Sequence, residues 1–66
     1  MKITVNGKPK QLDAPITVSA LLEALQLDGN RVAIELNRNV LLKEQFAATS
    51  LQDGDAMEIV QFVGGG

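Results

Sequence analysis

Hydrophobic and polar residues alternate over residues 2–5 and again over residues 32–36, and a largely apolar stretch covers residues 57–63. Alternation with a period of two is typical of a strand that buries one face. Asn6-Gly7 follows the first of these stretches, and this pair favours a two-residue hairpin turn because both positions tolerate a positive φ. The pattern therefore predicts a chain that opens with a β-hairpin and contains a long strand near its last residues.

Two shorter strands complete the β elements. Residues 8–12 form the second arm of the hairpin, and Pro9 places this arm at a sheet edge because proline has no N–H to donate. Asn37-Arg38-Asn39 can turn the chain after residues 32–36. Val40-Leu41-Leu42 is then predicted to be the fourth strand.

One amphipathic helix is expected between the hairpin and residue 32. Its apolar stripe has the spacing i, i+3, i+4, i+7 and consists of Val18, Leu21, Leu22 and Leu25. Thr17 is the expected N-cap, and Gly29 is expected to take the left-handed position at the C-terminal end. A helix with a single apolar stripe is expected to cover one face of a sheet. A helix that binds a partner is the alternative.

The segment between the fourth and fifth strands contains a helical turn and a loop over residues 43–50, in which Phe46 is the expected core anchor. Residues 52–55, Gln-Asp-Gly-Asp, are predicted to form a turn in which Gly54 supplies the positive φ. Two carboxylates in this turn raise the alternative of a metal site. The spacing lacks the further ligands of a calcium loop, so we favour the turn.

The order ββαββ followed by a final β predicts an α+β fold. We expect the ubiquitin-like β-grasp, a mixed sheet of four to five strands around one main helix, with the first and last strands side by side. Residues 1–63 then form a single domain. If Met57 faces the helix, Val60 and Phe62 lie on the other face, where apolar side chains often mark an interaction site. The alternative is that residues 43–56 fold over them.

Residues 64–66 are all glycine and are predicted to be a flexible tail. Without Cβ atoms, Gly64 and Gly65 can enter a narrow channel of another protein and leave the carbonyl carbon of Gly66 open to attack. Val60, Phe62 and Val63 would dock the folded body beside that channel. A frayed end or an engineered linker is the alternative interpretation of a glycine run.

Composition restricts the functions available to the chain. It has neither cysteine nor histidine, which excludes thiol nucleophiles and histidine acid–base catalysis, so we do not expect an enzyme. The net charge is −2 and the six basic residues are scattered, which argues against nucleic acid or an anionic membrane as a partner. The first residues lack the apolar segment of a signal peptide, so we expect a cytoplasmic protein.

Several short motifs together resemble the ThiS family, the ubiquitin-like sulfur carriers of thiamine biosynthesis. They are Asp53-Gly54-Asp55-Ala56-Met57-Glu58-Ile59-Val60-Gln61-Phe62-Val63, then Gly65-Gly66, with Asn37-Arg38-Asn39-Val40 and Glu44-Gln45-Phe46 upstream. The resemblance covers the whole chain, and each motif alone is weakly specific. Gly64 departs from the pattern by making the diglycine a triglycine, at a position that usually varies.

The resemblance implies a chemistry for Gly66. Its carboxylate would be adenylated by a ThiF-type adenylyltransferase that uses ATP and Mg²⁺, while the chain itself binds no cofactor. The adenylate would take sulfur from a persulfide donor supplied by a cysteine desulfurase. The resulting thiocarboxylate would deliver sulfur to a ThiG-type thiazole synthase.

Two other functions fit the same residues. The first is a sulfur carrier for a different product, as in molybdopterin synthesis or tRNA thiolation. The second is a β-grasp module that binds a partner without covalent chemistry and has an incidental glycine tail. Blocking the terminus distinguishes them, because a carrier would lose its function and a docking module would keep it.

Overall fold

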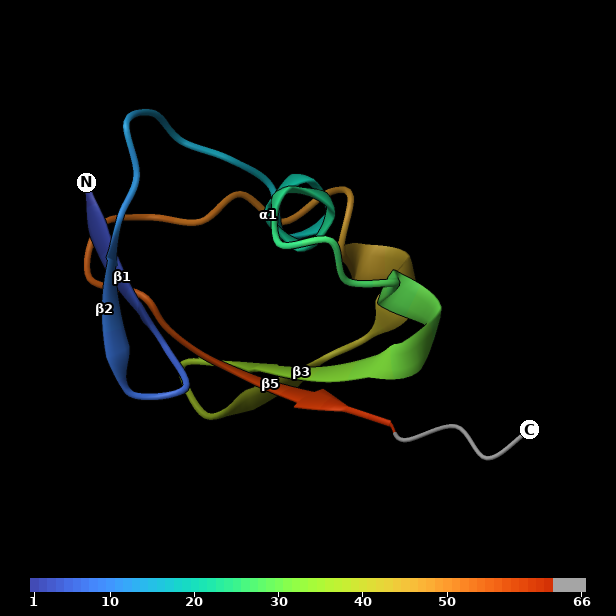
Figure 1. Ribbon diagram of the computed structural model, residues 1–66. Coiled ribbons are helices and arrows are strands. Elements are labelled where there is room, and N and C mark those ends of the chain that lie inside the picture. The colour runs from blue at the N-terminus through green and yellow to red at the C-terminus, as the bar shows by residue number, and fades with distance from the viewer. Residues whose placement is uncertain (63–66) are drawn as a thin grey trace.

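Five strands form one mixed sheet in the computed structural model, which describes residues 1–62 (Figure 1). The strands are β1 (Lys2–Val5), β2 (Lys8–Gln11), β3 (Val32–Leu36), β4 (Asn39–Leu41) and β5 (Ala56–Gln61). Their order across the sheet is β2-β1-β5-β3-β4. β5 runs parallel to β1 and antiparallel to β3, so the last strand in the sequence lies in the centre of the sheet. This arrangement confirms the predicted fold class.

The two hairpins have the turns that the sequence predicts. Asn6 and Gly7 have φ of 52° and 78°, and Asn37 and Arg38 have φ of 52° and 71°. Two successive positive φ values match the twist of the flanking strands. β2 forms an outer edge of the sheet, which confirms the position expected from Pro9.

The helix α1 (Val18–Ala24) begins as predicted, with the Thr17 side chain accepting a hydrogen bond from Ala20 N at 3.1 Å. Two further N–H groups of its first turn are satisfied by the loop that follows β4. Val18 N donates to Thr49 O at 2.9 Å, and Ser19 N donates to Phe46 O at 3.0 Å. These bonds draw the loop across the start of the helix.

The predicted role of Gly29 at the end of the helix is wrong. The helix stops at Leu25, and Gln26 takes the left-handed conformation with φ of 61°. Gln26 N bonds to Glu23 O and Leu27 N bonds to Leu22 O, the pair of contacts that defines a Schellman cap. Gly29 instead begins the short 3₁₀ helix η1 (Gly29–Arg31), which leads into β3.

The core lies between α1 and one face of the sheet, and no polar residue in residues 1–62 is buried. Phe46, just after the 3₁₀ helix η2 (Lys43–Gln45), is buried there as predicted. The buried residues are Ile3, Leu12, Val18, Leu21, Leu22, Val32, Ile34, Phe46, Leu51 and Met57. α1 and the loop after β4 both lie on the same side of the sheet (Figure 1). Among the described residues, no helix is long and apolar enough to cross a membrane.

Candidate functional site

The candidate site is the sheet face that lies opposite the helix, near the end of β5. Met57 is fully buried against the helix, so the side chains of alternate residues in β5 point to the other face. Val60 is 60% exposed and Phe62 is 54% exposed. The exposure expected for these two residues is therefore confirmed, and the alternative that residues 43–56 cover them is wrong.

Two apolar residues of the second hairpin extend this surface. Leu41 pairs with the buried Ile34, so its neighbours Val40 and Leu42 point to the open face. They are 74% and 54% exposed. Val60 pairs with Ala33, and the register of β3 and β4 brings Leu42 to the other side of Ala33. We call Val40, Leu42, Val60 and Phe62 the open-face patch.

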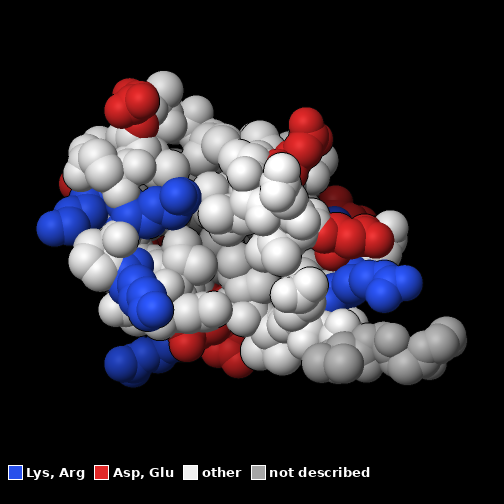
Figure 2. Space-filling view, in the orientation of Figure 1, with Lys and Arg blue, Asp and Glu red and all other residues white. Residues whose placement is uncertain are grey.

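Two glutamates lie on the same face beside the open-face patch. Glu35 and Glu58 are direct partners in the pairing of β3 with β5, and both are exposed. Like charges in opposite positions of a strand pair destabilise a sheet. In Figure 2 the lower edge of the molecule, below the sheet of Figure 1, carries acidic atoms next to uncharged ones. Most of the basic atoms in this view lie toward the β1–β2 hairpin, which contains Lys2, Lys8 and Lys10, and a further basic group lies on the opposite side beside acidic atoms.

Side chains from the two hairpin turns fix the position of β5. Asn6 Oδ1 accepts a hydrogen bond from Ile59 N at 2.7 Å. Asn37 Oδ1 accepts one from Ala56 N at 2.9 Å, and Asn37 N donates to Ala56 O at 2.7 Å. At the other end of the strand, Phe62 N donates to Arg31 O at 2.7 Å. The residues that precede position 63 are thus held firmly to the folded body.

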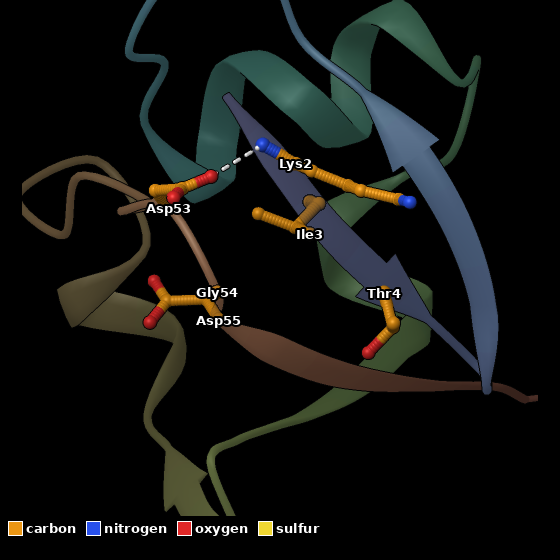
Figure 3. Close-up of a pocket in the computed structure, with 6 residues that line it drawn as sticks. All are labelled: Lys2, Ile3, Thr4, Asp53, Gly54 and Asp55. Atoms are coloured by element: carbon orange, nitrogen blue, oxygen red, sulfur yellow. Dashed lines mark hydrogen bonds between the residues drawn. The ribbon is translucent and has the colours of Figure 1, made fainter.

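A hollow of about 290 Å³ lies between β1 and the turn that precedes β5 (Figure 3). Its lining residues are Lys2, Ile3, Thr4, Asp53, Gly54 and Asp55. Asp53 Oδ1 accepts a hydrogen bond from Lys2 N at 2.7 Å, and Asp55 accepts bonds from Gln52 N and Asn37 Nδ2. These carboxylates therefore hold the turn together, and Gly54 has the predicted positive φ of 89°. Residues 1–62 contain no group of three side chains suited to a metal ion.

The remaining predicted site residues lie outside the described part of the chain. They are Val63, Gly64, Gly65 and Gly66. Sequence reasoning did not find Val40 and Leu42 as members of the site. The signal was present, because Val40 and Leu42 flank Leu41 in a strand with a period of two, but three consecutive apolar residues do not show which face is covered.

Comparison with known proteins agrees with this architecture. The ThiS family model matches residues 3–66. The chain belongs to the ThiS family. It is 35% identical to the sulfur carrier protein ThiS of Escherichia coli, with both chains covered completely. The crystal structure of the thiamine biosynthesis protein ThiS from Geobacter metallireducens has 46% sequence identity and a TM-score of 0.85, again over all of both chains.

Longer proteins also contain a region similar to this member of the ThiS family. The chain is 42% identical over 66 residues to a thiazole synthase of Paramagnetospirillum magneticum and 39% identical to one of Magnetococcus marinus. It spans 20% of the length of each of these two relatives. The ThiS-like region of each thiazole synthase thus occupies about a fifth of the polypeptide.

Proposed function

We propose that this chain is a sulfur carrier protein that donates sulfur for thiazole formation in thiamine biosynthesis, and that it is not itself an enzyme. Membership of the ThiS family across residues 3–66 is the observation that carries this proposal. Relatives named sulfur carrier protein ThiS and thiazole synthase both support the thiazole product over the alternatives.

The proposed carrier atom is the carboxylate carbon of Gly66. An α-carboxyl group has a pKa of about 3.3–3.7, so at neutral pH it is an anion and a poor acyl donor. Adenylation gives the acyl group a good leaving group. A carboxylate oxygen attacks the α-phosphorus of ATP, and pyrophosphate leaves. Cationic groups and Mg²⁺ of a ThiF-type enzyme would stabilise the developing charge. The proposal requires the Gly66 carboxylate to be free.

Sulfur transfer follows from the acyl adenylate. The terminal sulfur of a persulfide attacks the carbonyl carbon of Gly66, and AMP leaves. A second thiol then cleaves the resulting disulfide and releases the thiocarboxylate. The chain has no cysteine that could compete for the sulfur, so the sulfur is held only on the main chain.

The proposed partners are a ThiF-type adenylyltransferase, a persulfide donor such as a cysteine desulfurase, and a ThiG-type thiazole synthase. Similarity to a fifth of two thiazole synthases supports the last of these. The open-face patch supplies an apolar surface that includes Phe62, the residue directly before position 63 in the chain, which suits the docking of such enzymes. The need for ATP agrees with the cytoplasmic location expected from the sequence.

Intact-mass measurement tests the proposal. The chain is incubated with ATP, Mg²⁺, a ThiF-type enzyme and a persulfide donor, and a matched reaction omits ATP. We expect a gain equal to the mass difference between one sulfur and one oxygen, located on Gly66 by fragmentation. Sulfur on another residue, or no ATP-dependent gain, would contradict the proposal.

A further inference from the structure

The strand β5 extends beyond the end of its neighbour β1. β1 ends at the Asn6-Gly7 turn, and its pairing with β5 covers only Thr4 with Ala56 and Val5 with Met57. The pairing of β3 with β5 continues as far as Val32 with Gln61. In Figure 1, β5 accordingly runs past the β1–β2 hairpin toward the C-terminal side of the molecule. The second half of β5 thus has a strand on one side only.

The hydrogen bonds show which backbone groups face the free side. Asn37 N donates to Ala56 O, and Phe62 N donates to Arg31 O, so the even-numbered residues of β5 bond to the β3 side. The odd-numbered residues face the other side, where Asn6 N donates to Met57 O and Ile59 N donates to Asn6 Oδ1. The bond of Ile59 N is the last one on this side of β5. Beyond it, three backbone groups have no hydrogen-bond partner within residues 1–62, namely Ile59 O, Gln61 N and Gln61 O.

This free edge lacks the features that protect the other edges of the sheet. Natural proteins protect exposed edges with proline, lysine or very short strands, because unpaired backbone groups can bind another chain. β2 contains Lys8, Pro9 and Lys10, and β4 has only three residues. The free edge of β5 presents uncharged Ile59 and Gln61 instead.

We propose that the backbone of β5 from Ile59 to Gln61 pairs with an extended strand of the enzyme that adenylates the chain. This inference rests on the proposed function, because an enzyme that holds Gly66 must lie beside the end of β5, only a few residues away. A strand parallel to β5 would donate to Ile59 O and Gln61 O and accept from Gln61 N, so all three free groups would be satisfied.

The open-face patch indicates the chemistry of the added strand. Side chains on neighbouring strands that point to the same face contact each other directly. Every second side chain of the added strand would therefore lie beside Val60 and Phe62, both more than half exposed. We infer that the partner strand has apolar residues at these positions, so main-chain bonds supply affinity and apolar contacts supply selectivity.

Amide hydrogen exchange of the intact protein tests directly whether an enzyme strand pairs with the free edge of β5. The exchange rate of the Gln61 amide is measured with and without the ThiF-type enzyme that gives the adenylation described above. We expect at least about tenfold slower exchange at Gln61 in the complex. Gln11 is the matched control. Met1 and Leu12 form a hydrogen-bonded pair between β1 and β2, so the next pair, Lys2 with Gln11, is a non-bonded one. The N–H of Gln11 therefore points away from β1, toward the outer edge of β2. We expect no change at Gln11.

Chemical synthesis provides a second, independent test. An N-methyl group on Gln61 blocks the free edge without removing a bond within the sheet, and an N-methyl group on Gln11 is its control. We expect the first to weaken enzyme binding at least about tenfold and the second by less than about twofold.

The outcomes separate this inference from the proposed function. A chain that is adenylated normally while its Gln61 amide exchanges freely in the complex would overturn strand addition alone. The absence of both complex and adenylation would remove the proposed function, and this inference with it. Protection of Gln61 that rises with protein concentration in the absence of enzyme would assign the edge to a second copy of the chain, which also overturns the inference.

Discussion

Asn6 and Asn37 hold the same strand from its two sides. Each is the first residue of a hairpin turn, and each has a φ of 52°. The Oδ1 atom of Asn6 accepts from Ile59 N, and that of Asn37 accepts from Ala56 N. One residue type thus provides both the left-handed backbone of the turn and an acceptor for β5, because asparagine tolerates a positive φ better than most residues with a side chain.

Replacement of Asn6 should separate these two roles. Asn6→Gly keeps the turn and removes the acceptor, so we expect the free energy of unfolding to fall by about 1 kcal/mol. Asn6→Asp keeps both the acceptor and the tolerance of positive φ, so its free energy of unfolding should fall by less than that of Asn6→Gly. Urea denaturation of both variants measures the difference, and equal losses would show that the bond to Ile59 contributes little.

Gly54 and Gly29 should respond oppositely to alanine. Gly54 has a φ of 89°, so Gly54→Ala is strained and should cost about 1–2 kcal/mol, although nothing lies within 4 Å of the added methyl group. Gly29 does not have a positive φ, and its Cβ would contact the Phe46 ring at 3.7 Å, an ordinary distance. Gly29→Ala should be neutral or slightly stabilising. Thermal unfolding compares the two, and a larger loss at Gly29 would contradict this assignment of strain.

Phe62→Asp should separate docking from folding. Because Phe62 is half exposed, we expect little change in melting temperature but a loss of about 1–2 kcal/mol or more in binding to the activating enzyme. Ala20→Asp is a matched control, since it adds the same charge to an exposed position of α1, on the other side of the sheet. Calorimetric titration measures both affinities. Equal affinities would remove Phe62 from the docking surface.

One residue added after Gly66 should abolish adenylation and leave the fold intact. The reacting atoms must approach to about 3–3.5 Å, and an added residue moves the carboxylate away from that position. Pyrophosphate exchange with ATP reports the reaction, and a circular dichroism spectrum reports the fold. Removal of Gly66 should have the same effect. Unchanged exchange with the longer chain would contradict the carrier proposal.

Valine at position 65 should slow sulfur transfer more than valine at position 64. A side chain next to Gly66 would crowd both the channel of the partner and the approach of the sulfur atom, whereas position 64 lies one residue farther from the reacting carbon. Single-turnover formation of the thiocarboxylate measures both rates. Equal and unimpaired rates would show that the channel tolerates side chains, although the carrier function would stand.

The sequence predicted most of the fold because its signals are local. The alternation over residues 2–5 and 32–36, the Asn6-Gly7 turn and the Thr17 cap each depend on neighbours in the chain, and all are present. Gly29 was assigned wrongly because Gln26 takes the left-handed conformation three residues earlier. The cap bond from Leu27 N to Leu22 O accompanies the burial of Leu22 in the core and the packing of Leu27 against that core, which residue preference alone does not reveal.

The site was predictable only in part. The period of β5 placed Val60 and Phe62 on one face, but whether that face is covered depends on the path of residues 43–55, which crosses the helix instead. The bond from Ile59 to Asn6 joins residues 53 positions apart, so no local pattern contains it. The free edge of β5 was equally hidden, since it arises from the difference in length between β1 and β5.

The central position of β5 has a consequence for the order of events during synthesis. β1 with β2 and β3 with β4 form two separate hairpins, and no strand pairing joins them until residues 56–61 lie between β1 and β3. Pairing between distant segments forms late because loop closure must precede it. The same strand carries Val60 of the open-face patch and leads to Phe62. Under the proposed function, a chain in which β5 has not yet paired would lack the Val60 and Phe62 half of the open-face patch, so the activating enzyme would adenylate chiefly molecules whose two hairpins are already joined by β5.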